Sequence, residues 1–285
     1  MNLLPVCIAA QRRDDKPVSS SEHERFQRAA ERIARACRTP ILEGLSSARV
    51  SIKPDRTVVT EVDLAVQRQV FDSLASEFPD HALVGEEDES AARLSPRLPG
   101  YAWVVDPIDG TRNYAVGFPC FATSIALLED GVPVVGVVAE HVSGQLFSAR
   151  LGAGVTLDGR PVRVSEGEGF RKKLIGIPTS MDAVTQRVVA GWFRRDDLIL
   201  RNTGSAAYHL ALVASGALNA AYGYQCKIWD IAAGALLVFE AAGRMTALDG
   251  AALFPWHPGD APDRNLPSLA AAPHLHETLI QDFRD

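Results

Sequence analysis

The segment that most constrains the fold is an apolar run, residues 101–105, followed by Asp106 and, three residues later, by Asp109. The run is short and rich in valine and tryptophan, so we predict a strand covered on both faces. Pro107 cannot donate a ladder hydrogen bond, and we expect it to end the strand and turn the chain. Asp106 and Asp109 would then converge from two sides of the bend, with the Ile108 carbonyl facing the same space. Three hard oxygen ligands in one place suit Mg²⁺.

Gly110 and Thr111 follow the second aspartate and favour an anion site beside the metal ligands. Glycine permits backbone geometry that a side chain would block, so a phosphate group can approach both amides closely. Taken alone, a proline-containing turn with two aspartates is more often only a turn. Two further acidic segments shift the balance towards a metal site.

Glu86 and Asp230 belong to two other segments that join an apolar element to an acid. Residues 82–88 look like a short strand that ends in acid, and residues 227–234 place Asp230 at the start of an apolar helix. Each segment has an ordinary alternative, because residues 86–89 could be a solvated acidic loop and Asp230 could be a helix N-cap. The combination of the three segments is more informative than any one of them.

Three motifs, in the same order, resemble those of the inositol monophosphatase superfamily of Mg²⁺-dependent, lithium-sensitive phosphatases. Residues 85–87 resemble the family's GEE element, residues 106–114 its DPIDGTxNF element and residues 229–234 its WDxAAG element. The similarity extends from about Ser51 to Gly243. Shorter segments that contribute to it are residues 59–63, 152–161 and 204–207.

The resemblance implies an α+β fold, the layered αβαβα sandwich of the inositol monophosphatase and fructose-1,6-bisphosphatase type. It also implies roughly two or three bound Mg²⁺ ions, with Asp63 helping to hold the last through water. The implied metal ligands are Glu86, Asp106, the Ile108 carbonyl, Asp109 and Asp230. The implied substrate-binding residues are Asp109, Gly110, Thr111, Gly204, Ser205, Ala206 and Asp230.

Glu86, Thr111 and Asp63 are the catalytic residues that the resemblance implies. Water held between Glu86 and Thr111 would attack phosphorus, and Glu86 would accept its proton directly or through the Thr111 hydroxyl. None of the seven histidines has a serine or cysteine nucleophile at a recognisable motif spacing, which argues against a covalent hydrolase. The resemblance further implies a homodimer and inhibition by lithium, and Lys53 lies where the family has a lysine near the site.

The expected substrate is a small phosphorylated metabolite, but Gly223 stands where inositol phosphatases carry a glutamate for the inositol hydroxyls. An inositol-1-phosphate-like monoester is the first hypothesis. Histidinol phosphate, fructose 1,6-bisphosphate and adenosine 3′,5′-bisphosphate are alternatives, and Tyr222, Tyr224 and Lys227 could supply other contacts. A non-catalytic binding or regulatory member of the fold is an alternative of another class, which the full set of acids disfavours.

Composition excludes several other classes of function. The 285 residues are 47% hydrophobic, enough to bury a sizeable core, and their formal net charge is -6. With no dense basic patch, this charge argues against nucleic-acid and anionic-membrane partners. Residues 3–10 are apolar but too short to span a bilayer, so we expect a cytoplasmic protein. Four scattered residues show no zinc-ligand spacing and are expected to be reduced thiols: Cys7, Cys37, Cys120 and Cys226.

The sequence patterns divide the chain into three parts. Residues 1–20 are expected to be a loose extension, residues 21–170 an α+β half with most metal ligands, and residues 171–285 an α/β half that closes the pocket. The elements predicted from periodicity and turn residues are a helix at 21–41, a hairpin at 50–59, a helix capped by Thr60, a meander of strands at 118–165, strands at 174–177, 198–202 and 218–222, and helices at 183–193, 205–215 and 230–242.

Overall fold

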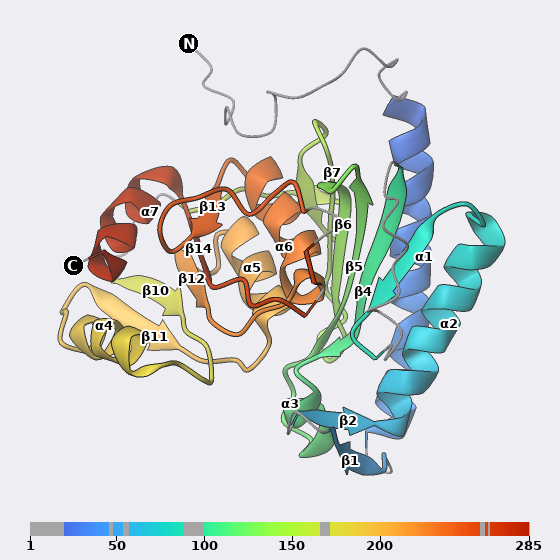
Figure 1. Ribbon diagram of the computed structural model, residues 1–285, viewed down its shortest axis with the longest axis horizontal. Coiled ribbons are helices and arrows are strands. Elements are labelled where there is room, and N and C mark those ends of the chain that lie inside the picture. The colour runs from blue at the N-terminus through green and yellow to red at the C-terminus, as the bar shows by residue number, and fades with distance from the viewer. Residues whose placement is uncertain are drawn as a thin grey trace.

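Five layers of helix and sheet make up the fold, as the computed structural model shows (Figure 1). The structure describes residues 20–45, 48–53, 57–87, 100–165, 172–256, 260–261 and 263–284. Along the horizontal axis of Figure 1, a pair of outer helices is followed by a sheet, two central helices, a second sheet and two further outer helices. The expected α+β fold with αβαβα layers is confirmed. The extension predicted at residues 1–20 lies outside the described residues, apart from Ser20.

The first outer layer consists of α1 (Ser20–Gly44) and α2 (Glu61–Glu77). The apolar positions of α1 recur at helical spacing and are buried against the first sheet. Thr60 caps α2 as expected, since its hydroxyl accepts a hydrogen bond from Asp63 N and the Asp63 carboxylate accepts one from Thr60 N. Before it, β1 (Val50–Ile52) and β2 (Val58–Thr60) form the predicted antiparallel hairpin. The turn expected at Pro54 and Asp55 lies outside the described residues.

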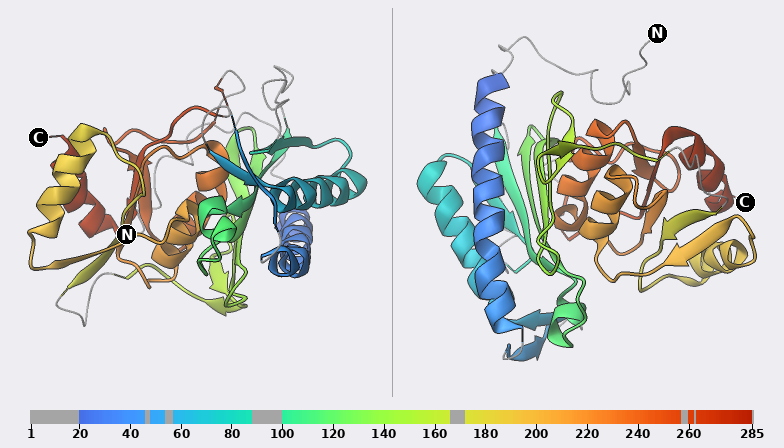
Figure 2. Two further views of the ribbon diagram at one scale, coloured as in Figure 1. Left: turned by 90° about the horizontal axis from the view of Figure 1, so that it is seen from below. Right: turned by 180° about the vertical axis from the view of Figure 1, so that it is seen from behind.

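The first sheet has seven strands in sequence order, covered by helices on both faces (Figure 2). Its first pair of strands is parallel and the rest are antiparallel, which confirms the predicted meander. Burial on both faces explains why its central strands are nearly continuous apolar runs. The strands are β3 (Ala82–Gly85), β4 (Tyr101–Asp109), β5 (Ala122–Glu129), β6 (Val132–Glu140), β7 (Leu146–Arg150), β8 (Val155–Leu157) and β9 (Arg160–Pro161).

Pro107 does not end β4, so the sequence-based expectation for this residue was wrong. Pairing with β5 continues to Asp109, through an irregularity of register between Asp106 and Asp109. Asp106 pairs with Ser124 and Asp109 with Ala122, so two residues of β4 lie opposite one residue of β5. This is a β-bulge, and a bulge tolerates proline because the extra residue makes no ladder bond.

The central layer consists of α5 (Ala206–Ala214) and α6 (Ile228–Glu240), which pack on each other and on the first sheet. Their small residues allow close contact. A Cβ atom on Gly234 of α6 would lie 2.5 Å from Leu210 Cβ, and one on Gly136 of β6 would lie 2.7 Å from the Ala233 carbonyl oxygen. The runs of alanine and glycine in these helices are therefore packing surfaces.

The second sheet has five strands in the order β11, β10, β12, β14, β13, with β10 parallel to both of its neighbours. Outside it lie α4 (Ala183–Phe193), α7 (Pro273–Leu279) and the short helix η2 (Ile280–Phe283). The last two strands and α7 were not anticipated. The strands are β10 (Lys173–Gly176), β11 (Leu198–Arg201), β12 (Ala220–Gly223), β13 (Arg244–Ala247) and β14 (Ser268–Ala271).

Three of the four cysteines, Cys37, Cys120 and Cys226, are buried free thiols as expected. Cys7 lies outside the described residues. A search of the described helices finds none whose length and apolar character would let it cross a bilayer.

Candidate active site

Three carboxylates meet where β4 ends and α6 begins. Asp106 and Asp109 come from the bulged end of β4, and Asp230 comes from the first turn of α6. One oxygen of each carboxylate lies within 4.8 Å of the corresponding oxygens of the other two. Within the part of the chain that the structure describes, no other set of acids, histidines or cysteines meets this criterion.

The residues present at this point fit a divalent cation. Burial, followed by the charge of Glu86, raises the pKa of Asp106 well above its usual range. Burial likewise raises the pKa of Asp109 and that of Asp230. Asp106 Oδ1 is fully enclosed and has no hydrogen-bond partner among the described residues. A hard cation would supply this oxygen with a partner and remove the repulsion between the carboxylates.

Asp109 is held by the start of α5. Its Oδ2 accepts hydrogen bonds from Ser205 Oγ and from Ala207 N, both at 2.6 Å. Ser205 is the N-cap of α5, and its Oγ also accepts a hydrogen bond from Tyr208 N at 3.3 Å. The N-terminus of a helix favours a carboxylate anion. The predicted substrate residues Gly204, Ser205 and Ala206 therefore adjoin Asp109 through this helix start.

Asp230 is the third residue of α6 and not its N-cap, which is Lys227. The helix begins at Ile228, two residues before the predicted start, and Asp230 Oδ2 accepts a hydrogen bond from Lys227 N at 2.6 Å. The first turn is tied to the first sheet, because Ser124 Oγ donates to the Trp229 carbonyl at 3.0 Å. The Asp230 carboxylate is therefore fixed relative to the end of β4.

Glu86 follows β3 and lies beside the three carboxylates without belonging to their closest set. Lys53 Nζ lies 3.6 Å from Glu86 Oε1 and 2.7 Å from Glu87 Oε2. Burial raises the pKa of Glu86 to about 7, against the opposing effect of Lys53. The Glu86 and Glu87 side chains are only 21% and 2% exposed, so the solvated-loop alternative is wrong for both. Residues 88 and 89 lie outside the described residues.

Asp63, Thr111 and the Ile108 carbonyl form a buried hydrogen-bonded group next to the carboxylates. Thr111 Oγ1 lies 3.0 Å from Asp63 Oδ1 and 2.9 Å from the Ile108 carbonyl oxygen. A hydroxyl has one hydrogen, so Thr111 donates to one of these acceptors at a time. Asp63 is completely buried, and burial raises its pKa while hydrogen bonds from Thr60 act in the opposite direction.

Gly110 starts the five-residue helix α3 (Thr111–Ala115) in a left-handed conformation, with φ of 96°. A glycine is needed, since a Cβ atom there would also lie 3.0 Å from the Cys120 carbonyl oxygen. In α3, Asn113 Nδ2 donates to the carbonyl oxygens of Cys120 at 2.6 Å and Thr203 at 2.7 Å. Asn113 therefore ties the end of β4 to the loop before α5, a role that sequence reasoning missed although the residue belongs to the central motif.

A cavity of about 200 Å³ opens beside Asp109 and Asp230. Gly204, Ser205 and Ala206 also border it, whereas Gly110 and Thr111 do not. Its other polar side chains were not singled out from the sequence, because they come from loops and strand ends that carry no motif. These residues are Thr179, Ser180, Asn202, His209, Gln225 and Ser268.

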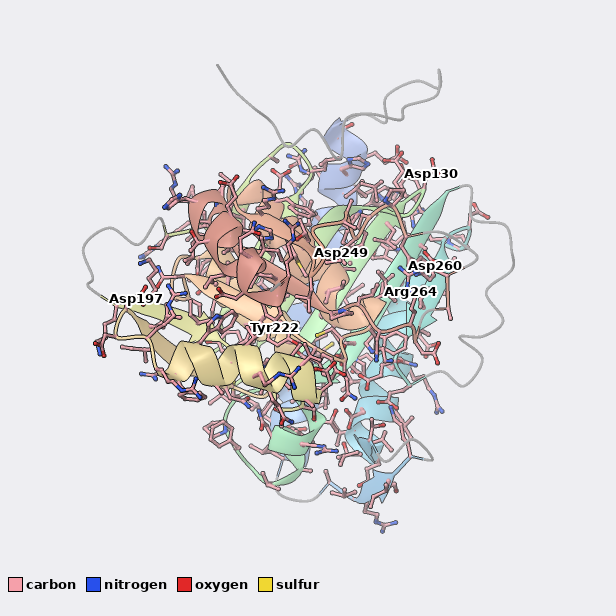
Figure 3. The ribbon with its side chains drawn as sticks, turned by 60° about the vertical axis from the view of Figure 1, so that its left-hand side comes forward. Asp130, Asp197, Tyr222, Asp249, Asp260 and Arg264 are labelled. Carbon is pink, nitrogen blue, oxygen red and sulfur yellow. The ribbon has the colours of Figure 1, made fainter. Side chains whose placement is uncertain are left out.

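Gly223 borders the cavity at the end of β12, where a side chain has little room. A Cβ atom there would lie 2.9 Å from Cys226 Sγ and 3.4 Å from Ser268 Oγ. Of the other contacts considered from the sequence, Tyr224 borders the cavity. Lys227 does not, because its amine donates a hydrogen bond to Asn265 Oδ1 at 2.6 Å. Tyr222, labelled in Figure 3, also borders the cavity, and its buried ring packs edge-on against Trp192 of α4.

Several known relatives of this chain are named as phosphatases. An inositol-1-monophosphatase of Mycolicibacterium smegmatis is 34% identical over 260 residues, which span 88% of this chain and 89% of the relative. A histidinol-phosphatase of Mycobacterium tuberculosis is 37% identical over 228 residues, spanning 75% of this chain and 83% of the relative. An IMPase structure from Thermotoga maritima superposes with a TM-score of 0.80 at 25% identity, over 92% of this chain and 97% of the other.

The fold, the acidic site and these relatives define a phosphoric monoester hydrolase. A sequence profile of the inositol monophosphatase family matches residues 14–285. The chain belongs to this family, as the three motifs indicated.

Proposed function

We propose that this protein is a Mg²⁺-dependent phosphatase that hydrolyses a small, inositol-1-phosphate-like monoester with water as the nucleophile. The observation that carries the proposal is the meeting of Asp106, Asp109 and Asp230: the first two are buried, and the last two border the cavity. A phosphate group at this wall would meet the cations, and the alcohol part of the ester would occupy the cavity. Membership of the family and the cavity's polar lining support this orientation.

Mg²⁺ held here would neutralise the phosphoryl oxygens and make a nearby water molecule more acidic. Asp106, Asp109 and Asp230 would hold it, with Glu86 and the Ile108 carbonyl as further ligands. Asp109 is oriented for this task by Ser205 and the amide of Ala207, and Asp230 by the first turn of α6.

Glu86 is the proposed acceptor of the proton that the attacking water loses. Its carboxylate lies beside Asp106, so a water molecule held by the cation would be within its reach. A second route would pass the proton of the water to the Thr111 hydroxyl, while that hydroxyl gives its own hydrogen to the Asp63 carboxylate 3.0 Å away. Asp63 would then act on the reaction through Thr111.

The cavity favours an ester with one phosphate group. None of the described residues that line it is a lysine or an arginine. His209 is neutral at pH 7, because burial lowers its pKa to about 4. A second phosphate, as in fructose 1,6-bisphosphate or adenosine 3′,5′-bisphosphate, would lose its hydration without gaining a cationic partner there. Hydroxyl, amide and imidazole groups instead suit a neutral polar alcohol.

Phosphate release with Mg²⁺ from inositol 1-phosphate, histidinol phosphate, fructose 1,6-bisphosphate and adenosine 3′,5′-bisphosphate tests this proposal. Asp109→Asn should abolish turnover, because the neutral amide weakens both cation binding and the contact with α5. Asp72→Asn is the matched control, since Asp72 is an exposed residue of α2 outside the site. Turnover of a monophosphate that fails only in Asp109→Asn supports the proposal.

Faster hydrolysis of a bisphosphate than of either monophosphate would contradict the substrate assignment. It would not contradict the proposal that the protein is a phosphatase. Bound Mg²⁺ without turnover of any ester would instead favour the non-catalytic alternative. The panel therefore separates the reaction from its substrate.

A further inference from the structure

The bulge in β4 decides whether Asp106 and Asp109 can act together. Successive side chains of a strand point to opposite faces, so residues three apart in a regular strand face opposite ways. The extra residue of a bulge shifts this alternation by one, which brings both carboxylates to the same side. The observed separation of their oxygens, within 4.8 Å, depends on this irregularity.

Thr123 lies opposite the bulge on β5, between the two residues that pair with Asp106 and Asp109. Its Oγ1 lies 2.7 Å from the Pro107 carbonyl oxygen, and the Thr123 side chain is fully buried. A carbonyl can only accept, so the Thr123 hydroxyl donates to Pro107. A side chain of the neighbouring strand therefore holds the carbonyl of the bulge.

His141 completes the arrangement from the residue after β6. Its Nε2 lies 2.7 Å from Thr123 Oγ1, whose hydrogen already points to Pro107, so Nε2 must carry the hydrogen of this second bond. His141 is 1% exposed, and its backbone is fixed by two contacts. Its amide donates to the Phe121 carbonyl at 3.3 Å, and its carbonyl accepts from Arg38 Nε at 2.9 Å.

We propose that Thr123 and His141 are positioning residues that hold the Pro107 bulge and thereby set the spacing of Asp106 and Asp109 for a divalent cation. The inference rests on the proposed Mg²⁺ site and adds two residues that touch neither the cation nor the substrate. His141 orients the Thr123 hydroxyl, Thr123 fixes the Pro107 carbonyl, and the fixed bulge presents both carboxylates to the same point.

The chain contains a matched control for this arrangement. Thr246 Oγ1 donates to the Ala247 carbonyl at 2.8 Å and lies 3.0 Å from His276 Nε2. Both residues of this pair are buried, on β13 and α7 of the second sheet and its outer helix. Removing the Thr246 hydroxyl therefore breaks the same kind of contact without disturbing the bulge.

The test is calorimetric titration of Thr123→Val and Thr246→Val with Mg²⁺ in the absence of substrate, together with their melting temperatures. Loss of an outer partner of metal ligands typically weakens metal binding by about 10-fold to 100-fold, which is the effect expected of Thr123→Val. Thr246→Val should melt earlier but bind Mg²⁺ as the unsubstituted protein does. Thr123→Ser, which keeps the hydroxyl, should restore most of the affinity.

His141→Leu provides a second variant that keeps the bond from Thr123 to Pro107 but removes its orienting donor. It should weaken Mg²⁺ binding less than Thr123→Val. Equal Mg²⁺ affinities for Thr123→Val and Thr246→Val would overturn the inference and leave the proposed function standing. Absence of Mg²⁺ binding by the unsubstituted protein would overturn both.

Discussion

Replacing Gly136 with alanine should destabilise the folded protein at the contact between β6 and α6. Gly136 lies in the middle of β6, and its Cβ atom would stand 2.7 Å from the Ala233 carbonyl oxygen and 3.1 Å from Ala233 Cα. Both are backbone atoms of α6, so no side-chain rotation can relieve the contact. The helix itself must move away from the sheet.

The size of the effect follows from this geometry. A shift of about 0.7 Å is needed to bring the carbon and oxygen into ordinary contact. Overpacking of this kind costs about 1–3 kcal/mol, which in a domain of this size lowers the melting temperature by about 2–10 °C. Asp230 lies one helical turn from Ala233, so its carboxylate would move with the helix. The groups of a binding site must be held to within about 0.5 Å of their productive positions. A displaced Asp230 carboxylate should therefore lower phosphatase activity as well.

Differential scanning calorimetry of Gly136→Ala and a phosphate-release assay would measure both effects. Gly191→Ala is the control, because Gly191 lies in α4 with no atom near its Cβ position. Alanine is the better helix former, so this control should gain up to about 1 kcal/mol. If Gly136→Ala has a melting temperature equal to or above that of the unsubstituted protein, the reasoning that this contact holds α6 in position is refuted.

Two further predictions concern pH and assembly. Burial lowers the pKa of His209 to about 4 from 6.5, so its contribution to stability is present above pH 6.5 and is lost as the pH falls towards 4. The difference in free energy of unfolding between the unsubstituted protein and His209→Gln, measured with urea, should therefore shrink by about 3 kcal/mol over this range, and a constant difference would contradict it. The resemblance to the family implies a homodimer, and we expect its interface at Ile52, Val116 and Phe118, which are 75%, 79% and 51% exposed. In sedimentation experiments Phe118→Ser should yield monomers and Phe193→Ser, on α4, should not; a monomeric unsubstituted protein would argue against the dimer.

Local patterns were sufficient to predict many of the elements. The helix at α4 has the predicted bounds, and Thr60 caps α2 as expected, because capping and helical periodicity depend on residues within a few positions. The predicted end of the strand at Pro107 was wrong, because β4 continues through a bulge. A bulge is defined by pairing with the neighbouring strand, which the sequence of β4 alone does not reveal. The strands β13 and β14 and the helix α7 also escaped prediction. Those two strands contain a single β-branched residue, Thr246, and no aromatic one, so their strand propensity is weak.

The sequence by itself determined the chemistry of the candidate site. The motifs identify which acids, glycines and hydroxyls are present, and the match to the family follows from the same amino-acid sequence. The tertiary structure decided which of these groups meet. It joined Asp109 to the start of α5, placed Glu86 beside Lys53, and left Gly110 outside the cavity wall. Distances between residues far apart in the chain depend on how helices and sheets pack, and packing is a property of the whole core that no single motif carries.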